Sequence, residues 1–357
     1  MYKLIKDISF YCSVLLIFVL ISCGGDPEPK GNDKPVIIKN SSKLITPKGL
    51  QKVNLGDLLT VQVTGNEIGV DSIAVSYQQK QLIQLADSNF LLDSKMLNAT
   101  GQVRLVVRVY LKNGKDEALY PKFNITPPAP EKVAYLKVKE YPHERSSYTQ
   151  GLFFKDGQLF ESTGEYGTSK LLKVDLQSGV ASQSSDLPND LFGEGMTYIG
   201  DTLYHLTYKA GKAFMYDMDF RQLQTFYYQG EGWGLTNIGD TLVMSNGTEN
   251  ITLRSKKDFS IYKTLAVHDD KGPVKNLNEL EIIDGYLYAN IYLTDKIAKI
   301  DLNNGAVVGI LDLANIFTNR AAFSGSIDVL NGIAYKEGKV YVTGKNWPKL
   351  YEIKLVN

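Results

Sequence analysis

A repeated pattern constrains the fold of this chain more than any other feature of its sequence. From about residue 133 onward, one arrangement occurs five times: an apolar run, a two-residue turn and a second apolar run. The first residues of successive copies lie 39 to 53 positions apart. Self-similarity at a period of this size is typical of propellers and solenoids. The five copies are 151–160, 195–204, 234–243, 279–288 and 332–341.

The composition of each copy predicts antiparallel strands. The turns are Asp-Gly, Gly-Asp or Glu-Gly pairs, which favour tight hairpins. A third, aliphatic run follows later in the copies and leads to an acidic turn, as at 171–175. Strands in series, with no helix between them, are typical of the four-stranded blades of a propeller. We therefore predict an all-β chain in which residues 133–357 form a five-bladed β-propeller.

Residues 37–126 show a different pattern, in which apolar and polar residues alternate with a period of two. The clearest run extends from Val103 to Leu111 and is followed by the turn pair Asn113-Gly114. Short alternating strands over about this length predict a small immunoglobulin-like β-sandwich. The segment has no His, no Cys and no clustered carboxylates, so we expect a spacer. A Pro-rich linker at 127–132 follows it.

The N-terminus has the pattern of a secretory signal over residues 1–22. Lys3 and Lys6 precede an apolar run of about 14 residues, which is too short for a comfortable membrane span. The run ends at Ser22-Cys23, which resembles the bacterial lipobox, where the cysteine is lipidated. An ordinary signal with a coincidental cysteine is the alternative.

If Cys23 carries the lipid, several acyl chains on one residue anchor the protein without a spanning helix. Residues 23–36 are rich in Gly, Pro and charge, and we interpret them as a flexible tether. We expect a lipid-anchored protein of the cell envelope, in the outer membrane, on its periplasmic or surface face. We also expect a monomer.

Composition excludes several functions. The 39 basic and 39 acidic side chains balance, and no Lys/Arg block is longer than two residues, so we expect no nucleic-acid partner. The three histidines, His143, His205 and His268, and the two cysteines are widely spaced. A zinc site of His and Cys ligands is therefore poorly supported, and we expect neither a metal nor another cofactor.

The residues at the start of each blade's first strand are the candidate site. In a propeller these strands line the central channel, so their first residues lie near its mouth. Four polar residues around one Trp have the composition of a small-molecule site. The alternative for the asparagines is that they only tie neighbouring blades together. The five residues are Gln150, Glu194, Trp233, Asn278 and Asn331.

Motifs in all five copies carry a resemblance to a known family. Residues 145–357 are similar to the plant and bacterial type of glutaminyl-peptide cyclotransferase, a zinc-independent family with a five-bladed propeller. Residues 23–132 lie outside the resemblance. The matching stretches are 148–152, 162–167, 192–195, 232–235, 277–281, 289–291, 329–334 and 343–351.

The resemblance implies the reaction and the residues that perform it. The α-amine of an N-terminal glutamine attacks its own side-chain amide, releases ammonia and leaves pyroglutamate. Glu194 matches the residue that shuttles the proton, and Lys345 matches a site lysine that orients a carboxylate or polarises the oxyanion. The partners are peptides or proteins with N-terminal glutamine. The implied substrate-binding residues are Gln150, Phe192, Tyr208, Trp233, Asn278, Tyr292 and Asn331.

The sequence departs from the family pattern at three aromatic positions. Tyr208 and Tyr292 stand where tryptophans are usual, and Tyr148 stands where Phe is usual. Aromaticity is retained while size and polarity change. These departures affect the expected substrate preference more than the expected reaction.

Two other functional classes compete with this interpretation. A noncatalytic surface propeller would bind peptides or glycans in the same channel without releasing ammonia. A surface scaffold would use the sandwich and would retain its role without residues 134–357. A Ser/His/Asp hydrolase is disfavoured because the chain has no Gly-x-Ser-x-Gly motif.

Overall fold

The computed structural model describes residues 41–356 except 66, 319–322 and 324–326. The expected signal (1–22), Cys23 and the expected tether (23–36) lie outside the described residues. Within the described part, nearly all regular structure is β-strand, with one 3₁₀ turn at Ser94–Leu97. The prediction of an all-β chain is confirmed for these residues. None of their helices is long and apolar enough to cross a membrane.

Residues 41–126 form three sheets around one core. The sheet orders are β1-β3-β6, β2-β10-β7 and β5-β4-β8-β9. The apolar positions of the period-two pattern point inward, since Val61, Val107 and Val109 are fully buried in this core. The strands are β1 (Lys43–Thr46), β2 (Leu50–Asn54), β3 (Leu58–Thr64), β4 (Val70–Tyr77), β5 (Lys80–Leu85), β6 (Asn89–Asp93), β7 (Gly101–Arg104), β8 (Val106–Leu111), β9 (Asp116–Leu119) and β10 (Lys122–Thr126).

One carboxylate fixes the beginning of the described chain. Glu117 accepts hydrogen bonds from the backbone N–H and hydroxyl of Ser41 and from the same two groups of Ser42. Burial alone would raise the pKa of Glu117, but the bonds from Ser42 and Ser41 outweigh it and lower the pKa to about 2. The first residues of the β-rich part are thereby held against β9.

Residues 131–356 form four-stranded antiparallel units. Three are separate sheets, and two are joined in one eight-stranded sheet with the order β26-β27-β28-β29-β11-β32-β31-β30. The strands are β11 (Glu131–Pro142), β12 (Thr149–Lys155), β13 (Gln158–Thr163), β14 (Lys170–Val174), β15 (Ala181–Asp186), β16 (Gly193–Ile199), β17 (Thr202–Thr207), β18 (Lys212–Asp217), β19 (Gln222–Tyr227), β20 (Leu235–Ile238), β21 (Thr241–Met244), β22 (Asn250–Ser255), β23 (Ile261–Ala266), β26 (Leu277–Ile283), β27 (Tyr286–Ile291), β28 (Lys296–Ile300), β29 (Val307–Asp312), β30 (Leu330–Lys336), β31 (Lys339–Gly344) and β32 (Lys349–Val356).

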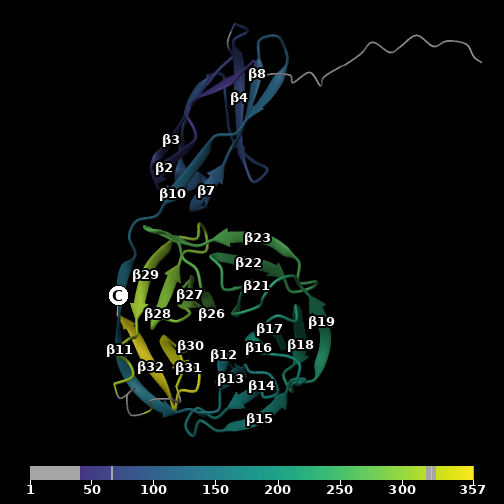
Figure 1. Ribbon diagram of the computed structural model, residues 1–357, viewed down its shortest axis with the longest axis vertical. Coiled ribbons are helices and arrows are strands. Elements are labelled where there is room, and N and C mark those ends of the chain that lie inside the picture. The colour runs from purple at the N-terminus through teal and green to yellow at the C-terminus, as the bar shows by residue number, and fades with distance from the viewer. Residues whose placement is uncertain (1–40, 66, 319–322, 324–326, 357) are drawn as a thin grey trace, which may run out of the picture. The chain divides into compact units, whose positions relative to one another are not determined.

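The units follow one another around a common centre. Figure 1 shows β12, β16, β26 and β30 toward the centre, with β15, β19 and β23 at the outside. Neighbouring first strands contact one another in a closed cycle, β12-β16-β20-β26-β30-β12. The long strand β11 completes the ring, because its first residues pair with β29 and the rest pair with the C-terminal strand β32.

Close approach of the first strands explains the glycine that opens most of the repeats. A Cβ at Gly234 would lie 2.0 Å from the carbonyl oxygen of Asn278 on the neighbouring strand. A Cβ at Gly195 would lie 2.4 Å from the backbone nitrogen of Leu235. Only glycine permits the backbones to approach so closely. The repeated glycine therefore sets the width of the ring.

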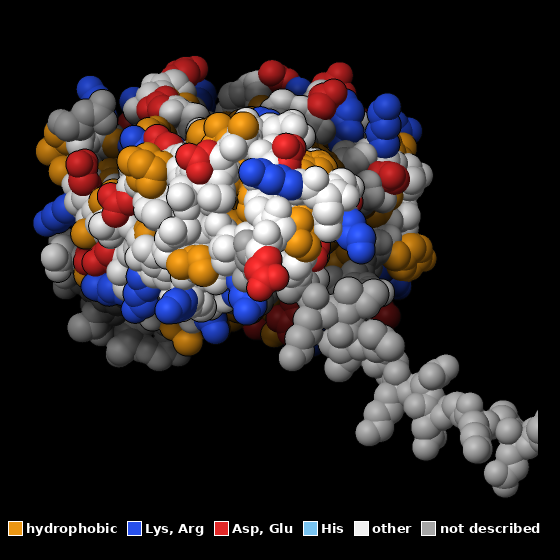
Figure 2. Space-filling model, turned by 90° about the horizontal axis from the view of Figure 1, so that it is seen from above, with side chains coloured by type: hydrophobic (Ala, Val, Ile, Leu, Met, Phe, Trp, Pro, Cys, Tyr) orange, Lys and Arg blue, Asp and Glu red, His pale blue; other side chains and the backbone are white. Residues whose placement is uncertain are grey.

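Hairpin geometry gathers the candidate residues at one end of the ring. The start of each first strand pairs with the end of the second, as in Gly193 with Thr207 and Leu277 with Ile291. The turns after β13, β17, β21, β27 and β31 therefore lie at the end where the first strands begin. On the face of the molecule seen in Figure 2, acidic, basic and hydrophobic side chains are interspersed.

Candidate active site

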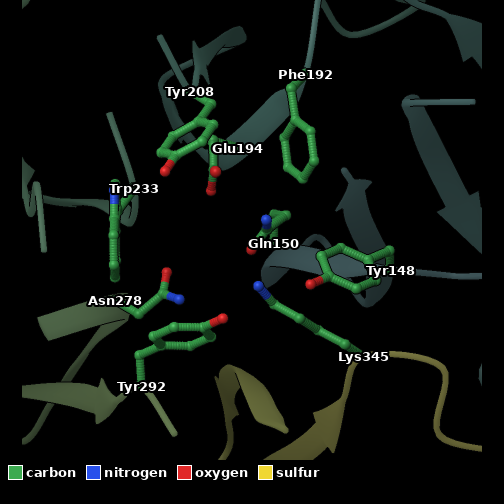
Figure 3. Close-up of a pocket in the computed structure, with 9 residues that line it drawn as sticks. All are labelled: Tyr148, Gln150, Phe192, Glu194, Tyr208, Trp233, Asn278, Tyr292 and Lys345. Carbon is green, nitrogen blue, oxygen red and sulfur yellow. The ribbon is translucent and has the colours of Figure 1, made fainter. Parts of the chain in front are cut away.

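A pocket of about 210 Å³ opens at this end of the ring. Figure 3 shows its side chains converging from different strands on one space. The pocket contains every expected site residue of the folded part except Asn331, and it adds Tyr148. The lining residues are Tyr148, Gln150, Phe192, Glu194, Tyr208, Trp233, Asn278, Tyr292 and Lys345.

Two kinds of position supply these side chains. Gln150, Glu194 and Asn278 lie at the starts of the first strands β12, β16 and β26. Tyr208 and Lys345 lie directly after the second strands β17 and β31. The register of each hairpin brings the two kinds of position together. The repeat itself therefore builds the pocket.

Glu194 is a buried carboxylic acid that faces the pocket. Its side chain is 4% exposed, and Ser162 donates a hydrogen bond of 2.7 Å to its backbone carbonyl. Burial raises the pKa of Glu194 well above its usual value, against the opposing effect of Lys345. Burial thus favours the protonated form of this carboxyl, which is the form that a general acid needs.

Lys345 enters the same pocket between two aromatic rings. Its ammonium nitrogen lies 4.5 Å from the centroid of Tyr148 and 5.2 Å from that of Tyr292. Burial lowers the pKa of Lys345, while the charges of Glu194 and Asp328 act to raise it. The two rings stabilise the charged form by cation–π contact. A cation is thus held in a largely dehydrated site.

Tyr148 and Asp328 form a pair that supports this cation. The Tyr148 hydroxyl donates a 3.2 Å hydrogen bond to Oδ2 of Asp328, and burial together with Asp328 raises the pKa of Tyr148. The backbone N–H of Asp328 donates to the carbonyl of Lys345. From the sequence, Tyr148 was noted only as a departure from the family, and Asp328 was not among the expected site residues. Asp328 directly precedes the matching stretch 329–334 but belongs to none of the quoted motifs, so the motifs did not point to it.

Aromatic side chains form the walls. Phe192 contacts Tyr208, with ring centroids 5.7 Å apart, and meets Tyr148 edge-on at 6.1 Å. On the other side, Trp233 and Tyr292 meet edge-on at 5.5 Å. Edge-to-face pairs of this kind are favourable and fix ring orientation. The pocket therefore has rigid apolar walls and a few polar groups.

The two candidate asparagines differ in their surroundings. Asn278 lines the pocket, and its buried Oδ1 has no hydrogen-bond partner among the described residues. Asn331 is fully buried and does not line the pocket. Its side-chain nitrogen donates to Oε1 of Gln150 at 3.0 Å and to the carbonyl of Thr149 at 2.9 Å. Asn331 thus lies behind Gln150.

Two further carboxylates and a histidine in the interior of the ring lie outside this pocket. Glu279 accepts backbone N–H groups of Leu152 and Ile333, and Glu281 accepts that of Tyr335. These carboxylates join first strands across the ring. His205 on β17 is fully buried, and burial lowers its pKa to about 3, so it is neutral.

The histidines do not supply a metal centre in the described part of the chain. His143 bonds Glu161 at 3.2 Å and faces the backbone of Trp347. No group of three or more His, Cys, Asp or Glu residues lies close enough to hold an ion within residues 41–356 as described. The polar groups of the pocket are instead one carboxyl, one ammonium, two amides, phenol hydroxyls and the indole N–H of Trp233.

The sequence matches a known family over most of its length. Residues 109–355 match the family described as glutamine cyclotransferase. The chain belongs to the glutamine cyclotransferase family. The match begins in β8, which is earlier than the start at residue 145 expected from the motifs. The predicted family is confirmed.

Two relatives support the assignment. A glutaminyl-peptide cyclotransferase of Arabidopsis thaliana is 36% identical over 225 residues, which are 61% of this chain and 70% of the plant protein. The crystal structure of the Myxococcus xanthus glutaminyl cyclase is similar with a TM-score of 0.59 at 35% identity. That match covers 64% of this chain and 100% of the bacterial one.

Proposed function

We propose that this protein is a glutaminyl-peptide cyclotransferase that converts N-terminal glutamine of peptides or proteins to pyroglutamate. The observation that carries the proposal is a buried carboxyl, Glu194, whose pKa is raised by burial, in a pocket that also holds Lys345. Membership of the glutamine cyclotransferase family supports the same reaction. The noncatalytic binding propeller is not favoured.

The reaction moves one proton between two nitrogens. The α-amine nitrogen attacks Cδ of its own glutamine side chain and forms the ring bond. The bond from Cδ to the side-chain nitrogen breaks, and ammonia leaves once that nitrogen has taken up a proton. Because burial favours its acid form, Glu194 gives this proton and takes another from the attacking amine. The carboxyl is restored at the end of each cycle.

The other polar groups act on the carbonyl oxygen, which becomes negative as the amine attacks. Lys345 supplies a positive charge inside an aromatic cage, where little water competes. Gln150 supplies an amide donor from the start of β12. Oδ1 of Asn278, for which the described part of the chain offers no hydrogen-bond partner, is suited to accept a hydrogen bond from the substrate amine.

The walls position the substrate for ring closure. A cavity of about 210 Å³ is smaller than the ~300–1,000 Å³ of ordinary ligand pockets. It therefore suits one residue, folded so that amine and carbonyl meet. Phe192, Tyr208, Trp233 and Tyr292 exclude water and restrict this residue. Pre-arranging the reacting atoms in this way accelerates an intramolecular attack.

The blade count and the domain division of the β-rich chain are also part of this proposal. We propose five blades, with β11 as the outer strand of the last blade beside β32, and an immunoglobulin-like sandwich at 37–126. The cycle of first strands and the four-stranded order of the units support five blades. The single core of residues 59–125 supports a separate sandwich domain.

We also propose that the protein acts as a lipid-anchored monomer at the outer membrane. The support is the Ser22-Cys23 sequence at the end of an apolar run. Replacing Cys23 by Ser is expected to release the protein from the membrane fraction or leave it unprocessed. A wild-type protein that takes up no labelled fatty acid would refute the anchor.

A direct assay tests the reaction. The purified protein is incubated with a glutaminyl dipeptide, and ammonia and the pyroglutamyl product are measured together. We expect both in equal amounts. Binding of the peptide without ammonia release would favour the noncatalytic propeller instead.

A further inference from the structure

The fully buried Asn331 is bonded to a residue of the pocket without lining the pocket itself. Its side-chain nitrogen donates to two acceptors, the Thr149 carbonyl at 2.9 Å and Oε1 of Gln150 at 3.0 Å. Gln150 is 2% exposed and lines the pocket. These hydrogen bonds connect β30, which opens the C-terminal unit of the ring, to β12, which opens the N-terminal one.

The Thr149 carbonyl decides which way both amides point. A backbone carbonyl only accepts hydrogen bonds, so the group of Asn331 that faces it must be the NH₂. The same NH₂ faces Gln150, so Gln150 must turn its oxygen toward Asn331. The NH₂ of Gln150 is then left for other partners. This order does not depend on how either amide is drawn, because it begins at the backbone.

The NH₂ group of Gln150, which does not bond to Asn331, lies on the side of the pocket that carries Phe192. A Cβ at Gly164 would lie 2.4 Å from the Phe192 ring and 3.0 Å from Nε2 of Gln150, so ring and nitrogen are neighbours. Figure 3 shows this nitrogen turned toward the part of the pocket where Glu194 and Phe192 lie. Gln150 therefore presents a donor to a bound substrate.

We propose that Asn331 is a positioning residue that locks the Gln150 amide with its NH₂ toward the substrate carbonyl oxygen. The inference rests on the proposed cyclisation and adds a role that the pocket lining does not show. Without the lock, Gln150 could rotate by half a turn and present its oxygen. Two oxygens would then face each other as negative charge develops, and the transition state would be destabilised.

Two substitutions separate orientation from simple packing. Asn331→Asp keeps the shape but replaces the donor by an acceptor, so Gln150 turns its NH₂ toward position 331 and its oxygen toward the substrate. Asn331→Leu removes the hydrogen bond to Gln150, so the Gln150 amide can adopt either orientation. We expect kcat to fall by about 10²-fold in Asn331→Asp, the loss typical of one missing oxyanion donor, and by about 10-fold in Asn331→Leu. A packing role predicts the reverse order.

The pH profile provides a second readout. A protonated Asp at position 331 regains an O–H that can donate to Gln150, so kcat relative to wild type should recover in Asn331→Asp as the pH falls. Asn331→Leu should show no such recovery. The titratable groups around the pair are Glu194 and Lys345 in the pocket, Glu161 bonded to Thr149, and Glu279 bonded to Ile333. All four remain in each variant, so the ratio to wild type removes their contribution.

A matched control is Asn237→Asp. Asn237 lies at the other end of β20 and donates from its side-chain nitrogen to the carbonyl of Gly239. The Asn237→Asp substitution introduces the same carboxylate into a first strand, but away from the pocket. Its kcat should remain within twofold of wild type at matched thermal stability.

A structural measurement keeps the proposal separate from the activity. In wild type, the side-chain amide protons of Gln150 should show nuclear Overhauser contacts to the Phe192 ring, and Asn331→Asp should lose them. Equal kcat in Asn331→Asp and wild type, or contacts that persist in Asn331→Asp, would overturn the lock. If wild type releases no ammonia while the contacts behave as expected, the proposed reaction fails and the orientation stands.

Discussion

The ammonium nitrogen of Lys345 lies 4.5 Å from the centroid of the Tyr148 ring, so the cation of the site rests on an aromatic face. The hydroxyl of the same ring donates to Asp328. Tyr148 therefore contacts the cation with its face and an anion with its edge. Through this one residue, the charge of Asp328 and the position of Lys345 are connected.

Separating these two contacts gives the first prediction. Tyr148→Phe keeps the ring face and loses the bond to Asp328, so kcat/KM should fall by about tenfold or less, as for one hydrogen bond. Tyr148→Leu also loses the cation–π contact, worth about 0.5–2 kcal/mol. The alkaline limb of its pH–rate profile should move to lower pH, because the ring no longer favours the charged form of Lys345. Both profiles are measured by steady-state kinetics.

The control for this pair is Tyr262→Leu, which removes an exposed ring on the outer strand β23. It should leave the pH profile unchanged. An alkaline limb that stays in place in Tyr148→Leu would show that the ring does not stabilise the Lys345 cation.

The second prediction concerns the proton. Glu194→Gln keeps the side-chain volume and removes the titrating group, so the chemical step should slow by about 10²- to 10⁴-fold. Substrate affinity should persist, since Trp233, Gln150 and Asn278 remain. Single-turnover cyclisation of a glutaminyl peptide measures the step separately from binding.

The matched control is Glu131→Gln, which replaces an exposed glutamate at the start of β11. It should turn over at the wild-type rate. A Glu194→Gln enzyme within threefold of wild type would eliminate Glu194 as the proton shuttle, and Glu279 and Glu281 would be the next carboxyls to test.

The repeat allowed part of the site to be predicted from sequence. Glu194 and Gln150 could be located because each hairpin brings the start of its first strand to the same end of the ring. Lys345 was found through its resemblance to the family, not through the repeat. The joining of two units in one eight-stranded sheet was not predicted, since the pairing of β11 with β29 connects segments far apart in sequence.

Contacts between distant residues explain what the sequence analysis missed. Asp328 meets Tyr148 across 180 positions, and Asn331 reaches Thr149 across 182. Neither contact has a local pattern. Asn331 was expected to touch substrate because its place at the start of β30 was predictable, whereas the direction of its amide depends on a carbonyl in another unit.

The third prediction is that strong chelators leave activity unchanged. No cluster of three or more potential ligands occurs in the described part of the chain, and Glu194 with Lys345 provides the proton and the charge. The measurement is turnover before and after prolonged treatment with a zinc chelator. Loss of activity that added zinc restores would contradict it.

The fourth prediction concerns Glu117. The pKa of Glu117 is lowered to about 2, so its stabilising effect is present above the unfolded value near 4.5 and is lost as the pH falls through 2. Glu117→Gln should therefore lower the melting temperature at pH 7, and the difference from wild type should shrink toward pH 2. Glu67→Gln, at an exposed turn, should show no such trend. A constant difference at every pH would mean that shape, not charge, holds Ser41 and Ser42.

The last prediction concerns Glu281, whose contribution to stability is lost as the pH rises rather than as it falls. Burial raises the pKa of Glu281 to about 8, against the opposing hydrogen bond from Tyr335. Since the pKa in the unfolded chain is near 4.5, the stability associated with Glu281 is complete below pH 4.5 and is lost as the pH rises to 8. Glu281→Gln still accepts the N–H of Tyr335 through its amide oxygen and cannot ionise. Its melting temperature relative to wild type should therefore rise across this window.

Thermal unfolding of wild type and Glu281→Gln at intervals between pH 4.5 and 8 tests this expectation. Glu337→Gln, in the exposed turn after β30, is the matched control and should give a flat difference. The pKa of Glu279 is also raised by burial and by the charge of Glu281. Removing the charge of Glu281 should therefore make Glu279 easier to ionise as well. The slope for Glu281→Gln should consequently exceed that of a single isolated carboxyl. A flat difference for Glu281→Gln would show that Glu281 is already ionised at low pH and that the two carboxyls join the first strands as anions.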